Sequence, residues 1–249
     1  MPLALTNISL GIGGGASATS SGAPPAPPPT PPYSTQSMDF DGSDEKVTCG
    51  SLSVAGYSEL SISAWVKIGS AQDCTIAAEY VGNWNRSFRF ILWDTIEAFR
   101  GVYFGVYIGG NEYYGHYALD PLPTGTWMHI AGTYDGSDVQ VYYNGSSGTS
   151  QSGSGNVDTN SSCVFQIGAM GSSNFTDGKI DEVAMWDSGL SASNITTIYG
   201  AGIPSSLSSL SPKSWWRMGE DATWGGSSYS IPDQNTTSGN DATTVNMEE

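Results

Sequence analysis

The feature that most constrains the fold is a series of short runs in which apolar and polar residues alternate. Between residues 60 and 68, Ile62, Ala64, Val66 and Ile68 alternate with Ser63, Trp65 and Lys67. Period-two alternation places successive side chains on opposite faces, which is typical of a half-buried β-strand. The same pattern predicts that Phe88, Phe90 and Leu92 face a core from residues 86–93, and that Val102, Phe104, Val106 and Ile108 do so from residues 101–108.

Turn signals separate these runs and several others. Runs at residues 127–134, 139–143, 164–169 and 179–186 have Asn144-Gly145 and Asp177-Gly178 beside them, and such pairs favour tight turns. Strands at this spacing predict an all-β, two-sheet antiparallel sandwich. One helix is expected at residues 193–199, with Ser191 or Ser193 as its N-cap and Gly200 or Gly202 at its end.

Charge excludes several classes of partner. The formal net charge is −16, with only eight Lys and Arg residues in the 249-residue chain. Nucleic acids and anionic membranes are bound through clustered cations, so neither is an expected partner. No run of apolar residues is long enough for a membrane span. Three cysteines are too few for a disulfide scaffold and show no zinc-ligand spacing.

The first 36 residues differ in composition from the rest of the chain. Residues 1–23 read as an anchoring or flexible arm rich in Gly, Ala and Ser, without the basic start of a secretory signal. Residues 24–36 form a spacer, with seven of the chain's 13 prolines between positions 24 and 32. Such a run prefers the extended polyproline II conformation.

Motifs from Ser37 onward resemble those of a known family. Residues 38–47 (MDFDGSDEKV), 60–67 (LSISAWVK), 126–136 (TWMHIAGTYDG) and 177–186 (DGKIDEVAMW) follow the order seen in laminin-G-like, concanavalin-A-like jelly rolls. The resemblance implies two stacked antiparallel sheets over residues 37–249. It also implies that Trp65, Trp127 and Trp186 are packing residues, and it does not imply a single activity.

The C-terminal segment departs from the usual order of that family. Residues 214–220 (SWWRMGE) and 231–243 (IPDQNTTSGNDAT) resemble the opening of such domains, yet here they follow the helix. We expect a permuted layout in which residues 213–249 close the sandwich beside the Phe40 strand.

The whole arrangement also resembles virion proteins of tailed phages of marine bacteria. This resemblance implies a structural protein on the virion surface, present in many copies or as a homo-oligomer and attached to other virion proteins through residues 1–36. Adhesion to neutral cell-surface glycans is then the expected further role. The alternative is a secreted, extracellular carbohydrate-binding or adhesion module, in which the arm would not be held by another chain.

Catalysis is not expected. A jelly-roll glycosidase needs two carboxylates about 5–5.5 Å apart for retention, and no Glu-x-Asp-x-x-Glu string occurs. Asp181 and Glu182 are adjacent, so on a regular strand they point to opposite faces. A glycoside hydrolase or lyase is a remote alternative.

Aromatic and guanidinium side chains gather between residues 84 and 117. A sugar ring stacks its C–H face on an aromatic ring while its hydroxyl groups bond to polar side chains. Parity puts Tyr103 and Tyr107 on the face opposite Phe104, and Arg89 and Trp93 opposite Phe90. The candidates for carbohydrate binding are Trp84, Arg86, Arg89, Trp93, Tyr103, Tyr107, Tyr113 and Tyr114, although packing is the competing explanation.

A structural Ca²⁺ ion is a further expectation. Calcium takes six to eight oxygen ligands, and members of the resembled family commonly bind one ion near the rim of the sandwich. The acidic positions that match are Asp41, Asp44 and Asp181.

Overall fold

The computed structural model describes residues 34–80, 86–158 and 164–247. The chain divides into two units, Met1–Pro31 and Pro32–Glu249, and every described residue belongs to the second unit. The predictions for the arm and most of the spacer therefore lie outside the described residues. No helix in the described ranges is long and apolar enough to cross a membrane.

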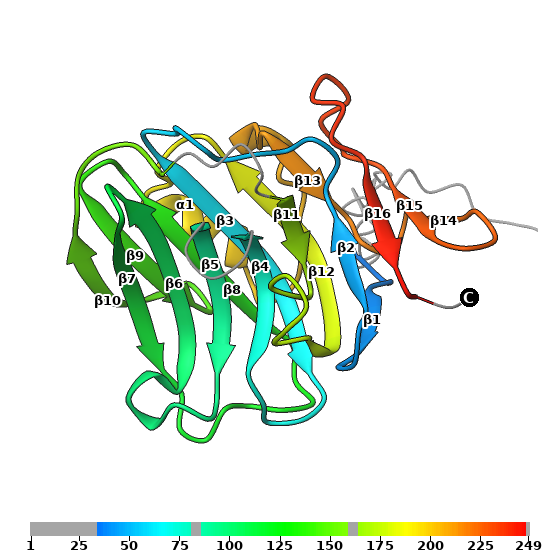
Figure 1. Ribbon diagram of the computed structural model, residues 1–249, viewed down its shortest axis with the longest axis horizontal. Helices are drawn as coiled ribbons and strands as arrows, with labels where there is room; N and C mark the ends of the chain where they lie inside the picture. The colour runs from blue at the N-terminus through cyan, green and yellow to red at the C-terminus, as the bar shows by residue number, and fades with distance from the viewer. Residues whose placement is uncertain (1–33, 81–85, 159–163, 248–249) are drawn as a thin grey trace, which may run out of the picture. The chain divides into compact units, whose positions relative to one another are not determined.

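Two antiparallel sheets stack on each other (Figure 1). One has seven described strands, in the order β1 (Met38–Asp41), β12 (Asp177–Trp186), β3 (Leu60–Ile68), β8 (Met128–Tyr134), β9 (Asp138–Tyr143) and β10 (Ser146–Ser152), with β13 (Ser214–Trp216) also paired to β12. The other has nine, in the order β14 (Thr223–Trp224), β15 (Tyr229–Ile231), β16 (Ala242–Val245), β2 (Lys46–Thr48), β11 (Val164–Ile167), β4 (Cys74–Tyr80), β5 (Arg86–Trp93), β6 (Gly101–Ile108) and β7 (Asn111–Ala118). The predicted all-β sandwich is confirmed.

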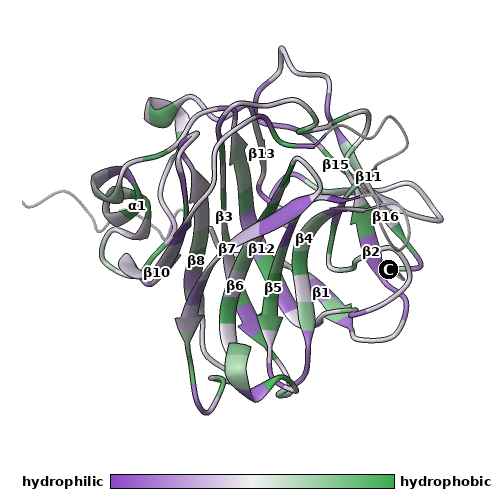
Figure 2. Cartoon of the chain, turned by 60° about the vertical axis from the view of Figure 1, so that its left-hand side comes forward, coloured by the Kyte–Doolittle hydropathy of each residue, from purple (hydrophilic) through white to green (hydrophobic). Residues whose placement is uncertain are grey.

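The main core fills the space between the sheets. The residues that alternation assigned to it on β3, β5 and β6 are all buried there, together with Phe165 and Val141. Phe90 and Phe104 pack edge to face, with ring centroids 5.6 Å apart. Gly132 lies against the Phe104 ring, because a Cβ atom on this residue would stand 2.2 Å from Phe104 Cγ. Figure 2 shows hydrophobic stretches along many of the strands, with polar stretches in others.

The single α-helix of the described chain covers the outer face of the seven-stranded sheet. Helix α1 (Ala192–Tyr199) begins at the N-cap Ser191, in a reciprocal capping box with Asn194, and ends at Gly200 with φ of 55°. Its buried residues Ile195 and Ile198 pack with Trp186 and Trp215 in a second hydrophobic cluster. Short 3₁₀ turns lie at Glu97–Phe99 (η1) and Ser208–Leu210 (η2). Trp65 and Trp186 are buried as expected, but Trp127 is 42% exposed, so its assignment to packing was wrong.

The C-terminal segment belongs to both sheets. Strand β13 pairs with Val183–Met185 of β12, and β16 pairs with β2. Figure 1 shows β16 (red) beside β2 (blue). Trp216 and Met218 are fully buried in the main core, and Trp215 lies in the helix-side cluster.

Removal of residues 213–249 should therefore destabilise the domain strongly. Truncating one buried tryptophan costs about 3–5 kcal/mol, and this deletion also exposes the edges of β2 and β12. We expect loss of the cooperative thermal transition, measured by circular dichroism. A truncated domain with the melting temperature of the intact chain would contradict this. Replacement of the exposed Ile203 by Ser provides a matched control that should leave the transition in place.

Candidate functional site

An aromatic cluster lies on the outer face of β5–β7. Ile91, Trp93 and Tyr103 form its buried centre, and Phe99, Tyr114 and Met170 pack around them. The Tyr103 and Tyr114 rings stack with centroids 4.9 Å apart, and Phe99 meets both edge-on at 5.6 Å. Because this cluster is separate from the main core, the parity prediction that placed Trp93 and Tyr103 opposite Phe90 and Phe104 is confirmed.

An ion pair between Arg89 and Glu112 lies on this face. Arg89 donates to both carboxylate oxygens of Glu112, from Nε at 2.5 Å and from Nη2 at 2.8 Å. Its guanidinium also lies over the Tyr103 ring, 5.0 Å from the centroid. Burial disfavours the cation, but the hydrogen bond and charge of Glu112 outweigh it and hold the pKa of Arg89 above its usual value. Glu112 therefore neutralises Arg89, which adds no uncompensated positive charge.

The remaining carbohydrate-binding candidates occupy different places. Arg86 donates to the Tyr107 hydroxyl at 2.8 Å, and both side chains are half-buried. Tyr113 packs against the main core, on the opposite face from Tyr114. Trp84 lies outside the described residues.

The accessibility of the rings differs from the sequence-based expectation. Tyr103 is only 3% exposed and Trp93 only 8%, because neighbouring rings cover them. Tyr107 and Tyr114 are half-buried and keep exposed surface. The accessible surface of this face therefore comes from Tyr107, Tyr114 and the edge of the Arg89–Glu112 pair rather than from the plane of Tyr103.

The three predicted calcium ligands do not come together. Asp41 and Asp44 line an acidic groove of about 1050 Å³ with Asp177 and Glu45. Asp41 pairs with Asp177 across β1 and β12, four residues before Asp181, which corresponds to roughly 13 Å along a strand. A calcium ion at Asp41 and Asp44 stays a prediction, and Asp181 belongs to a different group.

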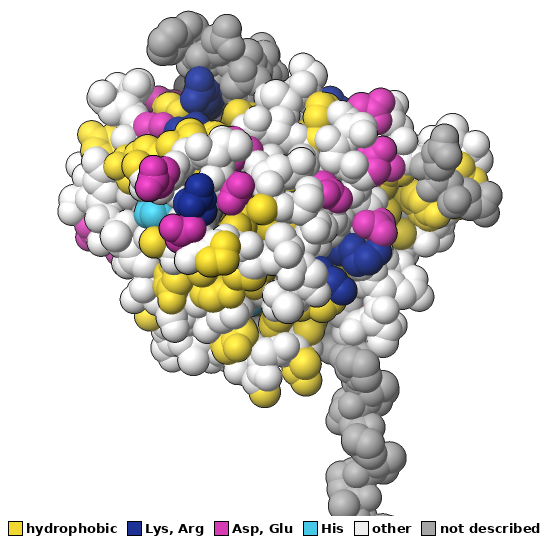
Figure 3. Space-filling view, turned by 90° about the horizontal axis from the view of Figure 1, so that it is seen from below, with side chains coloured by type: hydrophobic (Ala, Val, Ile, Leu, Met, Phe, Trp, Pro, Cys, Tyr) yellow, Lys and Arg dark blue, Asp and Glu magenta, His cyan; other side chains and the backbone are white. Residues whose placement is uncertain are grey.

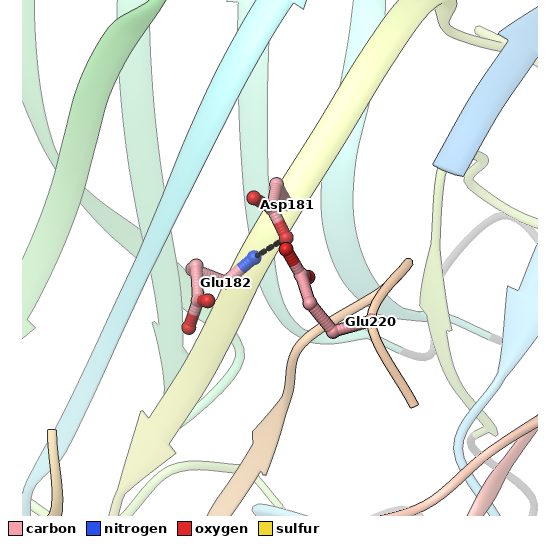
Figure 4. A group of neighbouring side chains, drawn as sticks. All are labelled: Asp181, Glu182 and Glu220. Carbon is pink, nitrogen blue, oxygen red and sulfur yellow. Dashed lines mark hydrogen bonds between the residues drawn. The ribbon is translucent and has the colours of Figure 1, made fainter. Parts of the chain in front are cut away.

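Asp181 forms a compact acidic cluster with Glu182 and Glu220, which we call the carboxylate cluster (Figure 4). One carboxylate oxygen from each residue lies within 4.8 Å of the other two. The expectation that Asp181 and Glu182 point to opposite faces was wrong, because the strand is irregular there. Glu182 has a φ of +50°, and the pairing of β12 with β3 shifts register between Asp181 and Ala184, which are the marks of a β-bulge.

Hydrogen bonds to the carboxylate cluster come from three separate segments. Glu182 accepts from Trp215 Nε1 at 2.6 Å and from Arg217 Nε at 3.2 Å. Asp181 accepts from the Glu182 amide at 2.7 Å and contacts the Ser34 hydroxyl. Glu220 accepts from the amides of Thr35 and Gln36, the latter at 2.9 Å. The cluster thus ties residues 34–36 and residues 215–220 to β12.

Burial sets the ionisation of this cluster. Desolvation raises the pKa of Asp181 to about 8 and that of Glu182 to about 7. Desolvation acts in the same direction on Glu220, but the backbone amides of Thr35 and Gln36 outweigh it and lower its pKa. Protein donors point at the oxygens of Asp181 and Glu182 and at Glu220 Oε1, whereas Glu220 Oε2 is buried without a hydrogen-bond partner among the described residues. Glu182 lies in the motif of residues 177–186, and Glu220 lies in that of residues 214–220. The expected permuted layout, which returns the second motif to the sandwich, was the only sequence signal that the two residues are close.

Asp181→Asn should change how stability depends on pH. The folded chain holds the Asp181 proton more tightly than the unfolded chain, so this residue's stabilising contribution falls as pH rises from about 4 to about 8. Asparagine resembles the neutral acid at every pH. We expect the variant to gain stability over the parent by about 1 kcal/mol for each pH unit between pH 5 and pH 8, measured by urea unfolding. The exposed Asp187→Asn is the control, and a pH-independent difference for Asp181→Asn would contradict the assignment.

Charged side chains are sparse on the molecular surface. Figure 3 shows one face, on which basic side chains lie beside acidic ones and hydrophobic patches are separated by uncharged polar surface. A strongly cationic area is absent from this view. The described surface in this view therefore offers no broad platform for polyanions.

Comparison with solved structures places this fold among known β-sandwiches. A protein of Bacteroides ovatus ATCC 8483 described as a candidate carbohydrate binder matches 84% of this chain, with 19% identity and a TM-score of 0.65, and the chain spans 58% of that protein. Domain 4 of the Geobacillus stearothermophilus extracellular arabinanase AbnA was solved with arabinotriose. The match covers 66% of the present chain and 76% of that domain's chain, with 22% identity and a TM-score of 0.51. Domains LG4-5 of the mouse laminin α1 chain match 61% of this chain and 41% of theirs, with 15% identity and a TM-score of 0.50. At these identities the likeness concerns the fold.

Sequence comparison identifies the family. Among curated proteins, none matches the chain. The family model Laminin_G_3 matches residues 41–196, from the end of β1 into α1, which is more than half of the chain. With its two antiparallel sheets and the four motifs in order, this chain belongs to the concanavalin A-like lectin/glucanases superfamily.

Proposed function

We propose that this protein is a non-catalytic carbohydrate-binding domain displayed on a virion surface, where it adheres to neutral glycans. The observation that carries the proposal is the face of β5–β7, where partly exposed tyrosine rings flank the Arg89–Glu112 pair. Aromatic rings offer a surface for the C–H face of a sugar. A bidentate ion pair offers donors and acceptors for its hydroxyl groups.

Charge supports neutral glycans as the ligand class. The chain carries −16 overall, so acidic polysaccharides are repelled at long range. The Arg89 guanidinium is already paired with Glu112. Similar folds occur in the candidate carbohydrate binder of B. ovatus and in the arabinanase domain solved with arabinotriose, which agrees with a sugar ligand.

The proposal of a non-catalytic domain rests on the state of the carboxylates. Asp181 and Glu182 are 3% and 2% exposed, and both accept hydrogen bonds from protein donors. A glycosidase needs one carboxylate as acid and another as nucleophile or base, both in contact with substrate. The carboxylate cluster instead holds three segments of the domain together.

The virion context rests on the sequence. We propose that residues 1–36 attach the domain to other virion proteins and that many copies are displayed together. Weak single-site binding then becomes strong, because multivalency raises avidity by roughly 10²–10⁴.

A glycan array probed with multivalent protein tests the ligand class. We expect binding to neutral glycans, and loss of binding in the Tyr107→Ala/Tyr114→Ala double variant, since both rings keep exposed surface. The double variant should keep the fold, whereas Tyr103→Ala should be destabilised by a few kcal/mol, because this ring is buried. Binding that survives unchanged in the folded double variant would exclude this face, and binding to no glycan would leave an architectural surface protein.

Deletion of residues 1–32 tests the virion context. The deletion ends before the first core strand, β1, begins at Met38, so we expect the shortened protein to keep its melting temperature. Its incorporation into particles, measured by immunoblot of purified virions, should be abolished. Equal incorporation of the shortened and full-length chains would contradict attachment through this segment and favour a secreted module.

A further inference from the structure

A second pocket lies on the outer face of the seven-stranded sheet, away from β5–β7. It has a volume of about 220 Å³. Trp127 and Ile203, two of the four large hydrophobic side chains exposed in the described chain, both line it. They are 42% and 56% exposed, and Pro204 lies beside them. Exposed apolar groups that converge on one hollow mark a binding site more often than scattered ones do.

The floor of this pocket is rigid and uncharged. Trp65 on β3 is the register partner of Asp181 on the neighbouring strand β12 and of His129 on the other neighbour, β8. The Tyr199 ring from α1 stacks on Trp65, with centroids 6.1 Å apart. Burial lowers the pKa of His129 to about 3, so this histidine is neutral beneath the floor. A ligand in this pocket therefore meets no positive charge from His129.

The opposite wall is polar. It consists of residues 34–37, whose position is fixed by the carboxylate cluster: Glu220 accepts from the amides of Thr35 and Gln36, and Ser34 contacts both Asp181 and Glu220. Hydroxyl, amide and carboxyl groups therefore face indole and aliphatic groups across the pocket.

This division of the walls selects the ligand. An aliphatic side chain would satisfy Trp127 and Ile203 but would leave the polar wall without partners. An anionic ligand would find no Lys or Arg among the described lining residues to balance its charge. Pockets for drug-sized ligands hold about 300–1,000 Å³, so 220 Å³ suits a unit about as large as one sugar ring. A neutral sugar ring, apolar on one face and hydroxylated at its rim, matches both walls.

We propose that the pocket between Trp127 and residues 34–37 is a second carbohydrate site, which takes one neutral sugar ring with its C–H face on the Trp127 indole. The inference shares its ligand class with the proposed function, but it uses different residues and a different sheet. The two sites would let one domain contact two points of a branched or dense glycan layer.

The indole N–H signals of the tryptophans in ¹⁵N-labelled full-length protein test this inference. Trp127→Phe and Trp93→Phe assign the signals of the pocket and of the β5–β7 face. D-glucose, D-galactose and N-acetyl-D-glucosamine are the probes, each titrated to roughly 100 mM because one ring with few contacts binds in the millimolar range. We expect a saturable shift of the Trp127 signal with at least one sugar.

Variants show whether the response belongs to the pocket. Ile203→Ser should raise the dissociation constant by roughly tenfold, which corresponds to about 1.4 kcal/mol of lost contact. Val164→Ser, which removes an exposed apolar side chain outside the pocket, is the matched control and should leave the constant unchanged. Both substitutions are at exposed positions, and thermal melting checks that the fold is kept.

The outcomes separate the two proposals. A saturable shift at Trp127 that Ile203→Ser weakens supports the pocket. A shift at Trp93 without one at Trp127 overturns the pocket and leaves the proposed function standing. Shifts at neither tryptophan overturn the pocket for these sugars, and the glycan array then decides the proposed function independently. A Trp127 shift unaffected by Ile203→Ser would also overturn the pocket as its source.

Discussion

Strand β12 carries the backbone pairing that joins the beginning, middle and end of this chain. It pairs with β3 along one edge, and with β1 and then β13 along the other. The change of partner on that second edge occurs at the bulge near Asp181 and Glu182, where the backbone turns two carboxyl groups toward residues 34–36 and 215–220. Burying acids costs free energy unless donors meet them. The indole of Trp215, the guanidinium of Arg217 and local amides meet that cost, so the permuted closure depends on these contacts.

Alternation and turns were sufficient to predict the sandwich, because each strand buries one face. Phe90, Phe104 and Ile62 lie where period-two counting placed them, and Ser191 caps the helix as its hydroxyl chemistry suggested. Period-two counting assumes a regular strand, so it could not anticipate the bulge at Glu182. The extra residue of a bulge moves each side chain after it to the other face. Counting also could not anticipate Trp127, whose motif is typical of packing although its ring lies beside an open pocket.

The sequence was sufficient to predict which face of the sheet carries the candidate site, but not which of its side chains are exposed. Parity placed Tyr103 correctly, yet Phe99 comes from the η1 turn outside the counted strands and covers it together with Tyr114. Tyr113 and Tyr114 are neighbours in sequence, yet Tyr113 packs against the main core and Tyr114 against the aromatic cluster on the outer face. Exposure depends on which loop folds over a strand, and this is tertiary information that a local pattern does not contain.

The grip of Glu220 on residues 34–36 has a mechanical consequence. A pull applied to the chain from the N-terminal side of Ser34 passes through residues 34–36 before it reaches β1. The load reaches the hydrogen bonds to Glu220 and Asp181 before it reaches the pairing of β1 with β12. These bonds join residues 34–36 to Glu220, which is partly exposed, and to Asp181, which is buried. These contacts would therefore bear such a pull before the strands of the sandwich do.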